Sequence, residues 1–279
     1  MLSGKIVHVS DAQGGITAQV EHVEIRGAPF VLKTDSQFDV AGEKLFQAEL
    51  QKLGLPHIAV YDHVDLRPDQ MLMQYIDAKS LNGPNFTNEN LAKLGQTLAR
   101  LHTRAFDRFY ALDAQARLRP DTWVQFVATM KNTANKTVLP KVGAKKAVER
   151  AAGRLLEQNP RSFVLCHGDV HGNNVFCTDS GIILYDNNAD CFVATPHYDL
   201  AILFGEVLPG YRYGSENAQG PRDRERMEAF LQGYGSLPED FDKYIDEYVL
   251  LRSLGRYPNH FVARQDAIIE LLINQQLSH

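Results

Sequence analysis

The sequence has few cysteines, no long hydrophobic stretch and no excess of basic charge. Its three cysteines are Cys166, Cys177 and Cys191, and none forms a Cys-x-x-Cys pair. An odd number of cysteines without such a pair predicts reduced thiols in a cytoplasmic protein and disfavours a Cys/His zinc site. No apolar run approaches the roughly 20 residues of a membrane helix, and the N-terminus has no signal-peptide pattern. We therefore expect a cytoplasmic protein with no membrane partner.

The charge balance also argues against a nucleic-acid partner. The chain has 29 Lys and Arg against 34 Asp and Glu, a net charge of −5, whereas nucleic-acid-binding domains usually carry a basic patch. Hydrophobic residues make up 44% of the 279 residues, as in ordinary globular proteins. This length allows two lobes but not two elaborate domains.

Polar residues are concentrated between short apolar runs in the middle of the chain. Residues 164–176, Val-Leu-Cys-His-Gly-Asp-Val-His-Gly-Asn-Asn-Val-Phe, are followed by Gly-Ile-Ile-Leu-Tyr-Asp at 181–186. Asp169, Asn174 and Asp186 have the spacing of a phosphoryl-transfer site. In such a site one carboxylate orients a hydroxyl and accepts its proton, while an amide and a second carboxylate hold Mg²⁺ on nucleotide phosphates. The spacing predicts Asp169 as catalytic and Asn174 and Asp186 as metal ligands.

The same segment resembles the catalytic loop of the aminoglycoside phosphotransferases and choline-kinase-like small-molecule kinases. The shared pattern is His-Gly-Asp-x-His-x-x-Asn, and Thr-Pro-His-Tyr-Asp-Leu-Ala at 195–201 resembles a later stretch of that family. The resemblance implies a protein-kinase-like two-lobe α+β fold, with an antiparallel sheet and one helix in the N-terminal lobe and a larger, mainly helical C-terminal lobe. It also implies ATP or GTP as phosphoryl donor and Mg²⁺ as cofactor. His167 would support the loop through hydrogen bonds, and Asp199 would brace the loop or cap the next helix.

Positions next to Asp186 depart from the family pattern. Tyr185 stands where Ile is usual, and Asn187 and Asn188 follow Asp186 where an apolar residue and then an acid are common. An Asn carbonyl can bind a metal but brings no charge, and Asp190 could compensate for it. Neither departure removes a core catalytic group.

The first 76 residues alternate in hydrophobicity, as strands do. A flap containing Gly14, Gly15 and Thr17 precedes a strand that ends in Lys33. A backbone without Cβ atoms can approach phosphates closely, and kinases bind these phosphates with a lysine on the third strand. We predict strands over 5–9, 18–25, 30–33, 58–64 and 70–76, and a helix over 42–53.

The predicted helix over 42–53 carries two glutamates that could pair with Lys33. Its periodicity leaves both Glu43 and Glu49 open, and the family resemblance favours Glu43. By the same resemblance, adenine would contact the backbone of Gln74 and Ile76, with Met73 at the entrance of the pocket. These residues complete the predicted nucleotide site.

Beyond residue 76 the pattern becomes helical. Basic residues over 141–157 are predicted to form a solvated helix face. We expect a nucleotide-binding lobe over 1–76 and a catalytic and acceptor-binding lobe over 77–279. The predicted helices are 88–104, 122–131, 141–157, 199–208, 222–234, 239–256 and 258–276.

Acidic residues are in excess over 181–250, with thirteen Asp and Glu against five Lys and Arg. A negative wall would suit a small cationic acceptor such as an aminoglycoside, an amino sugar or an amino alcohol. Solvated helix faces explain the acids equally well. Residues 203–212 also resemble the fructosamine-kinase branch, whose acceptor is a ketosamine. The acceptor-binding candidates are Asp190, Glu239, Asp242, Asp246 and Glu247.

Two other classes of protein stay open. Gly-Asp-Val-His-Gly at 168–172 resembles part of the metal-dependent phosphoesterase signature. That class needs further ligands, an upstream Asp-x-His and a later Asn-His-Asp/Glu, and the chain has neither. The other class is a nucleotide-binding scaffold without turnover. The choice between ATP and GTP, between antibiotic resistance and metabolism, and the oligomeric state are left open by the sequence.

Overall fold

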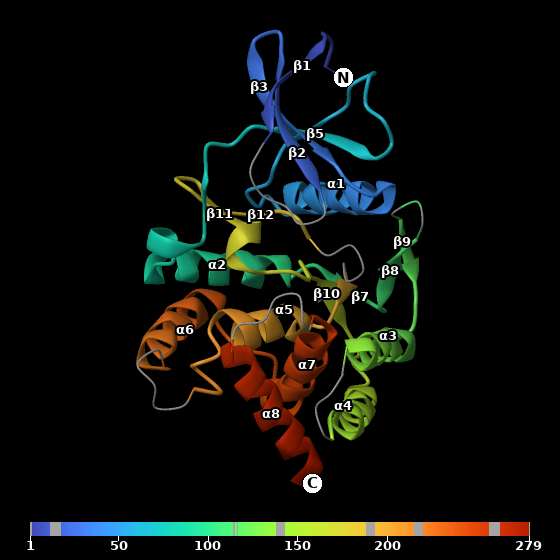
Figure 1. Cartoon of the computed structure of the whole chain (residues 1–279), viewed down its shortest axis with the longest axis vertical. Helices are drawn as coiled ribbons and strands as arrows, with labels where there is room; N and C mark the ends of the chain where they lie inside the picture. The colour runs from blue at the N-terminus through green and yellow to red at the C-terminus, as the bar shows by residue number, and fades with distance from the viewer. Residues whose placement is uncertain are drawn as a thin grey trace.

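The computed structural model has a sheet at one end of the molecule and most of the helices at the other (Figure 1). The predicted flap with Gly14, Gly15 and Thr17 lies outside the described residues, and so do Asn188 and Asp190. The structure describes residues 2–11, 18–113, 115, 117–137, 143–187, 193–214, 220–256 and 263–278.

The sheet lobe is a five-stranded antiparallel sheet with the order β1-β2-β3-β5-β4. A two-residue turn at Arg26 and Gly27, both with positive φ, joins β2 to β3, and this turn geometry matches the twist of a hairpin. Successive residues of β5 face opposite sides, so Leu72 packs in a different apolar cluster from Met71. The strands are β1 (Ile6–Asp11), β2 (Gln19–Ile25), β3 (Ala28–Thr34), β4 (Val60–Tyr61) and β5 (Gln70–Gln74).

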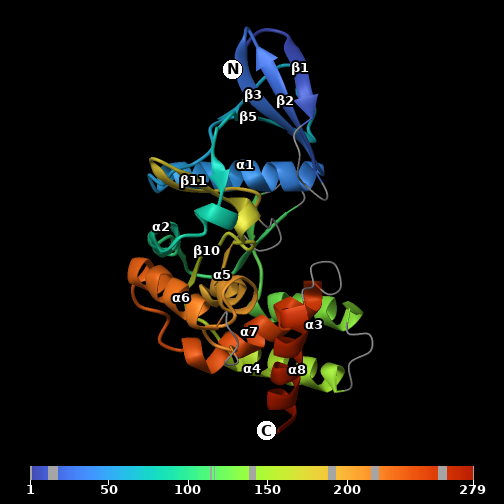
Figure 2. The same cartoon turned by 60° about the vertical axis from the view of Figure 1, so that its left-hand side comes forward.

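Helix α1 (Gln37–Lys52) crosses beneath this sheet and connects it to the rest of the molecule (Figure 2). It begins five residues before the predicted start, because the Ser36 hydroxyl accepts a hydrogen bond from the Asp39 amide and caps the helix. Gln47 donates to the Leu184 carbonyl at 2.9 Å and accepts from the Ile58 amide at 2.8 Å. The predicted strand over 58–64 is therefore short, since the Ile58 amide binds a side chain of α1 instead of a neighbouring strand.

The helical lobe contains two small sheets among its helices, with the orders β7-β10-β13-β8-β9 and β12-β11-β6. Its short strands β6 to β9 and β13 were not predicted. The strands are β6 (Lys79–Ser80), β7 (Ala105–Phe106), β8 (Tyr110–Leu112), β9 (Leu118–Pro120), β10 (Phe163–Leu165), β11 (Val175–Thr178), β12 (Gly181–Leu184) and β13 (Val193–Ala194). The helices are α2 (Asn88–Leu101), α3 (Trp123–Thr137), α4 (Ala144–Gln158), α5 (His197–Ile202), α6 (Gly220–Tyr234), α7 (Phe241–Arg256) and α8 (Ala263–Ser278).

The basic face predicted for residues 141–157 is only partly solvated. Arg154 pairs with the buried Glu247 carboxylate of α7 at 3.0 Å. Arg150 donates to the Gln276 backbone carbonyl of α8, and the Gln276 side chain donates to Glu247 at 3.0 Å. The solvated face is found at the exposed Lys145 and Lys146, whereas Arg150 and Arg154 also hold α7 and α8.

The single tryptophan, Trp123, is part of the core of the helical lobe. It is 9% exposed, and its ring lies 5.3 Å from the ring of Phe126 and 6.0 Å from that of Phe163. The indole N–H donates to the Leu155 carbonyl at 2.9 Å, so its one polar group is satisfied inside the core.

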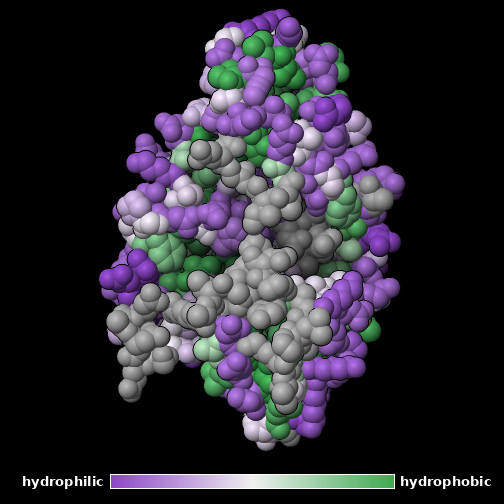
Figure 3. Space-filling model, in the orientation of Figure 1, coloured by the Kyte–Doolittle hydropathy of each residue, from purple (hydrophilic) through white to green (hydrophobic). Residues whose placement is uncertain are grey.

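The viewed surface is largely hydrophilic, with hydrophobic side chains visible on the sheet lobe (Figure 3). None of the helices in the described parts of the chain has both the length and the apolar character that crossing a bilayer requires.

Two glycines allow α2 and α6 to pack backbone against backbone. A Cβ atom added at Gly95 of α2 would lie 2.2 Å from the Phe230 carbonyl oxygen. A Cβ atom added at Gly233 of α6 would lie 1.9 Å from the Ala92 carbonyl oxygen. Neither neighbour is a flexible side chain, so an added methyl group would push the helices apart.

We expect Gly95→Ala to lower the free energy of unfolding by about 1–3 kcal/mol, the usual cost of overpacking. Gly153→Ala is the matched control, because Gly153 is also helical and no atom lies within 4 Å of its added Cβ. The control should be neutral or stabilising by up to about 1 kcal/mol through helix propensity. Urea unfolding measures both, and equal effects would contradict close helix packing at Gly95.

Candidate active site

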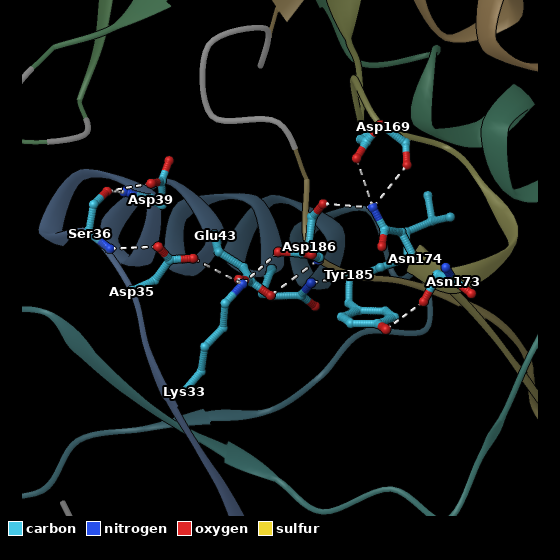
Figure 4. Close-up of polar contacts among 12 residues, drawn as sticks. Lys33, Asp35, Ser36, Asp39, Glu43, Asp169, Asn173, Asn174, Tyr185 and Asp186 are labelled. Atoms are coloured by element: carbon cyan, nitrogen blue, oxygen red, sulfur yellow. Dashed lines mark hydrogen bonds and ion pairs between the residues drawn. The ribbon is translucent and has the colours of Figure 1, made fainter. Parts of the chain in front are cut away.

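A buried ammonium group joins the sheet lobe to the end of β12. The Lys33 Nζ atom of β3 lies 2.7 Å from Glu43 Oε2 of α1 and 2.6 Å from Asp186 Oδ1 (Figure 4). Asp35 is a third carboxylate, 4.0 Å from the same nitrogen. Of the two glutamates that were left open, Glu43 is the partner of Lys33, whereas Glu49 pairs with Lys52 and Arg104.

The pKa values of Lys33 and Glu43 both depend on burial and on the charge of the partner. Burial by itself would lower the pKa of Lys33, but the Glu43 and Asp186 carboxylates raise that pKa well above its ordinary value. Burial also raises the pKa of Glu43, against the opposing effect of the Lys33 ammonium. Lys33 therefore stays charged, and Glu43 depends on it for a counter-charge.

Asp169 and Asn174 lie next to Asp186, at the end of the catalytic-loop segment. The Asn174 side-chain nitrogen is 3.1 Å from Asp169 Oδ2 and 3.3 Å from the Asp186 carbonyl oxygen (Figure 4). Asp186 has a φ of 56°, a strained value for a residue other than glycine. The structure thus brings together the three residues whose spacing predicted a phosphoryl-transfer site, and it places Lys33 beside them.

A buried carboxylate holds the backbone of this loop from below. Asp199 accepts hydrogen bonds from the His167 amide at 2.8 Å and the Gly168 amide at 2.6 Å, and His102 lies 3.2 Å away. Burial would raise the pKa of Asp199, but these partners lower it below its ordinary value. The alternative helix-cap role is wrong, because Pro196 precedes the first residue of α5 and Asp199 lies inside the helix.

The ring of His167 also supports the loop. Its Nε2 atom donates to the Tyr185 carbonyl at 2.8 Å, and its Nδ1 atom accepts from the Asp169 amide at 3.1 Å. Burial lowers the pKa of His167, so the ring is neutral and both nitrogens are used by the backbone. This arrangement leaves no proton-accepting role for His167.

Two side chains that sequence reasoning did not assign also touch Asp169. Arg252 Nη2 of α7 lies 3.0 Å from Asp169 Oδ1, and His171 Nε2 lies 3.3 Å from Asp169 Oδ2. His171 was in the quoted motif but was given no chemistry, and Arg252 was only one residue of a predicted helix. No spacing signal links residues 169 and 252, so this contact required the fold.

Tyr185, the departure from the family pattern, has a clear packing role. Its ring stacks on the Phe176 ring of β11, with 4.1 Å between centroids and an angle of 3° between planes. Its hydroxyl donates to the Asn173 carbonyl, and burial raises the pKa of Tyr185 to about 12. The stack forms a flat aromatic layer beside Asp186.

The predicted adenine contacts lie in and after β5. Met73 is buried in an apolar cluster with Val40 and Ile183. Gln74 and Ile76 line a cavity of about 950 Å³ whose lining does not include Lys33 or the predicted catalytic residues. The adenine contacts therefore stay a prediction.

The predicted acidic wall is not formed by unpaired acids on α7. Asp242 and Asp246 lie 2.7 Å and 2.8 Å from nitrogens of Arg212. Glu247 is buried against Arg154, as described above, and Glu239 is exposed. Asp242 and Asp246 share one arginine and Glu247 pairs with another, so the role of these acids in binding an acceptor stays a prediction.

The fold and the site together define a phosphotransferase of the protein-kinase-like class. Solved structures with the same fold include a spectinomycin phosphotransferase in complex with ADP and spectinomycin, at 14% identity and a TM-score of 0.59, covering 96% of this chain and 92% of that one. A thermostable mutant of an aminoglycoside phosphotransferase, in complex with AMP-PNP and hygromycin B, matches at 14% identity and a TM-score of 0.61, covering 98% and 93%. A choline/ethanolamine kinase family protein from Mesorhizobium loti matches at 18% identity and a TM-score of 0.60, covering 99% and 88%.

The sequence model of the phosphotransferase enzyme family matches residues 8–243, and the chain belongs to that family. No curated protein matches by sequence. The predicted family and the two-lobe α+β fold are confirmed, and the enzyme is a phosphotransferase with an alcohol group as acceptor. The phosphoesterase and inactive-scaffold alternatives are set aside on this basis.

We expect Lys33→Met to destabilise the protein by about 3–5 kcal/mol near neutral pH, because it leaves Glu43 as an unpaired buried charge. Without Lys33, burial holds the folded-state pKa of Glu43 above its ordinary 4.5. A raised carboxyl pKa gives stability that is complete below pH 4.5 and is lost as pH rises through the folded pKa. The deficit relative to the parent should thus grow as the pH rises from about 4.5 toward and beyond neutral.

Urea unfolding across this pH range measures the deficit. The control is Lys33→Met/Glu43→Gln, which removes the titrating carboxyl and should show a nearly constant deficit. A constant deficit in Lys33→Met itself would contradict the dependence of Glu43 on Lys33.

Proposed function

We propose that the protein is a small-molecule kinase that transfers the γ-phosphate of ATP or GTP, with Mg²⁺, to a hydroxyl group of a small acceptor. The observation that carries this proposal is the meeting of Lys33, Asp169, Asn174 and Asp186 at one place between the sheet lobe and the helical lobe. The nucleotide-binding lobe spans residues 1–76, with Gly14, Gly15 and Thr17 over the phosphates, and the catalytic lobe spans 77–279.

Asp169 is the residue that accepts the proton of the acceptor hydroxyl. Its side chain is 19% exposed, so an acceptor can reach it, while its orientation is held by several contacts. Transfer of a phosphoryl group depends mainly on positioning and on stabilising charge, so the proton moves late and a weak base suffices. Lys33 binds nucleotide phosphates, and Glu43 keeps Lys33 in place.

The residues at the site suit a magnesium ion. Asp186 and Asn174 offer a carboxylate and an amide oxygen, the hard donors that Mg²⁺ prefers, and the Asp186 side chain is 49% exposed. Mg²⁺, when bound, would neutralise charge on the phosphate oxygens. The Asn174 side-chain nitrogen contacts the Asp169 carboxylate and the Asp186 backbone carbonyl. These two contacts hold the Asn174 side chain next to Asp186.

The acceptor is a small cationic alcohol in this proposal. The names of the similar structures include an aminoglycoside phosphotransferase and a choline/ethanolamine kinase. A ketosamine is the second candidate, on the resemblance of residues 203–212 alone. The small, odd number of cysteines in the sequence supports a cytoplasmic location in this proposal.

We expect Asp169→Asn to abolish acceptor-dependent release of ADP or GDP while nucleotide still binds, because the proton acceptor is lost but the phosphate ligands remain. A coupled optical assay would test aminoglycosides, ketosamines, amino sugars, choline and simple sugars. Asp62→Asn, at an exposed position after β4, is the matched control. Unchanged turnover in Asp169→Asn would remove Asp169 from its assigned role.

We expect Asp186→Asn to raise the Mg²⁺ concentration needed for half-maximal turnover by about tenfold or more, since even outer-shell changes cost metal sites that much affinity. A magnesium titration of the same assay measures this change. The assignment fails if the variant and the parent require the same Mg²⁺ concentration or if chelation of divalent ions leaves turnover intact.

A further inference from the structure

Arg252 lies outside the residues that the family model matches, yet it contacts the predicted catalytic carboxylate. Its side chain is 4% exposed. The guanidinium binds Asp169 Oδ1 through Nη2 and Glu206 Oε1 through Nε, each at 3.0 Å. Its carbon atom Cζ lies 5.1 Å from the centre of the Tyr198 ring. The side chain is thus held by three groups from two different parts of the chain.

The local backbone explains how Glu206 reaches this arginine. Residues Leu203–Val207 form a π-helical turn that follows α5, and such turns contain one extra residue that re-aims its neighbours. A Cβ atom added at Gly205 would lie 2.6 Å from Val249 Cγ1, so the turn lies directly against α7. Val249 precedes Arg252 by three residues and shares its side of the helix.

The contact with Arg252 determines how the Asp169 carboxylate is oriented. Arg252 holds Oδ1, while Asn174 and His171 contact Oδ2 at 3.1 Å and 3.3 Å. A carboxylate whose two oxygens are both held cannot rotate freely about the Cβ–Cγ bond. A planar guanidinium can bind one carboxylate through Nη2 and another through Nε at the same time, whereas a lysine ammonium lacks this fixed geometry.

We propose that Arg252, fixed by Glu206, is a positioning residue that orients Asp169 for the acceptor hydroxyl. This inference rests on the proposed kinase function. Arg252 acts through Asp169 and takes no part in nucleotide binding. Its effect belongs to the catalytic step, since a small misplacement of a reacting group can cost about a hundredfold in rate.

The test compares the variants Arg252→Met, Arg252→Lys and Glu206→Gln. MgATP is the donor, and the acceptor is the compound from the coupled assay above that the unmodified protein turns over fastest. We expect kcat to fall about 10–100-fold in Arg252→Met, less in Arg252→Lys, and least in Glu206→Gln. The KM for MgATP should stay within about twofold of the parent, because in this proposal Arg252 acts through Asp169, the acceptor of the hydroxyl proton. Arg104→Met is the matched control, since Arg104 also pairs with a glutamate, Glu49, and lies over a ring, Phe106.

A second measurement tests the contact without any turnover. Thermal unfolding of Arg252→Met, Asp169→Asn and the double variant should give non-additive shifts in Tm, because the two side chains interact directly. Additive shifts would overturn the contact.

Unchanged or increased kcat in Arg252→Met, with an active parent, overturns the positioning role alone. A KM for MgATP that rises in parallel with the fall in kcat also overturns it, because it points to a general structural effect. Absence of any turnover by the parent overturns the kinase proposal and this inference with it.

Discussion

The buried Asp199 carboxylate is the interaction on which the arrangement of the site depends. It is fully buried and accepts hydrogen bonds from two consecutive amides of the catalytic loop. His102, which directly follows α2, contacts the same carboxylate and also the Tyr234 hydroxyl of α6. A buried charge is tolerated only when its hydrogen bonds are satisfied. The loop, α2 and α6 therefore keep one relative position, and the side chain of Asp169 starts from a fixed backbone.

The contacts of Lys33 with Glu43 and Asp186 constrain the part of the site near the sheet lobe in a similar way. The two short contacts of Lys33 join a strand of the sheet, helix α1 and Asp186, the second residue after β12. Because α1 also packs Phe46 and Leu50 into the main core of the helical lobe, it belongs to both lobes. Helix α1 and the buried pair of Lys33 and Glu43 therefore hold the sheet lobe in position against the helical lobe.

Sequence spacing located Asp169, Asn174 and Asp186 because they are close along the chain and share one loop system. The Lys33–Glu43 pair needed the family resemblance, since helical periodicity places Glu43 and Glu49 equally well. The pairing of the α7 acids with Arg212 and Arg154 was not predicted, because these arginines lie thirty or more residues away along the chain. Arg252 and Glu206 carried no signal, because their meeting depends on the close approach of a π-helical turn to α7 at Gly205. Such approaches are set by packing and leave no regular pattern.

The position of Trp123 has a spectroscopic consequence. As the only tryptophan, it lies in the core of the helical lobe among Phe126, Phe163 and Tyr248. Its emission consequently follows the unfolding of that lobe, and the sheet lobe contributes only tyrosine signal, from Tyr61 and Tyr75. Circular dichroism records both lobes at once. A difference between the fluorescence and dichroism midpoints would therefore measure how independently the two lobes unfold.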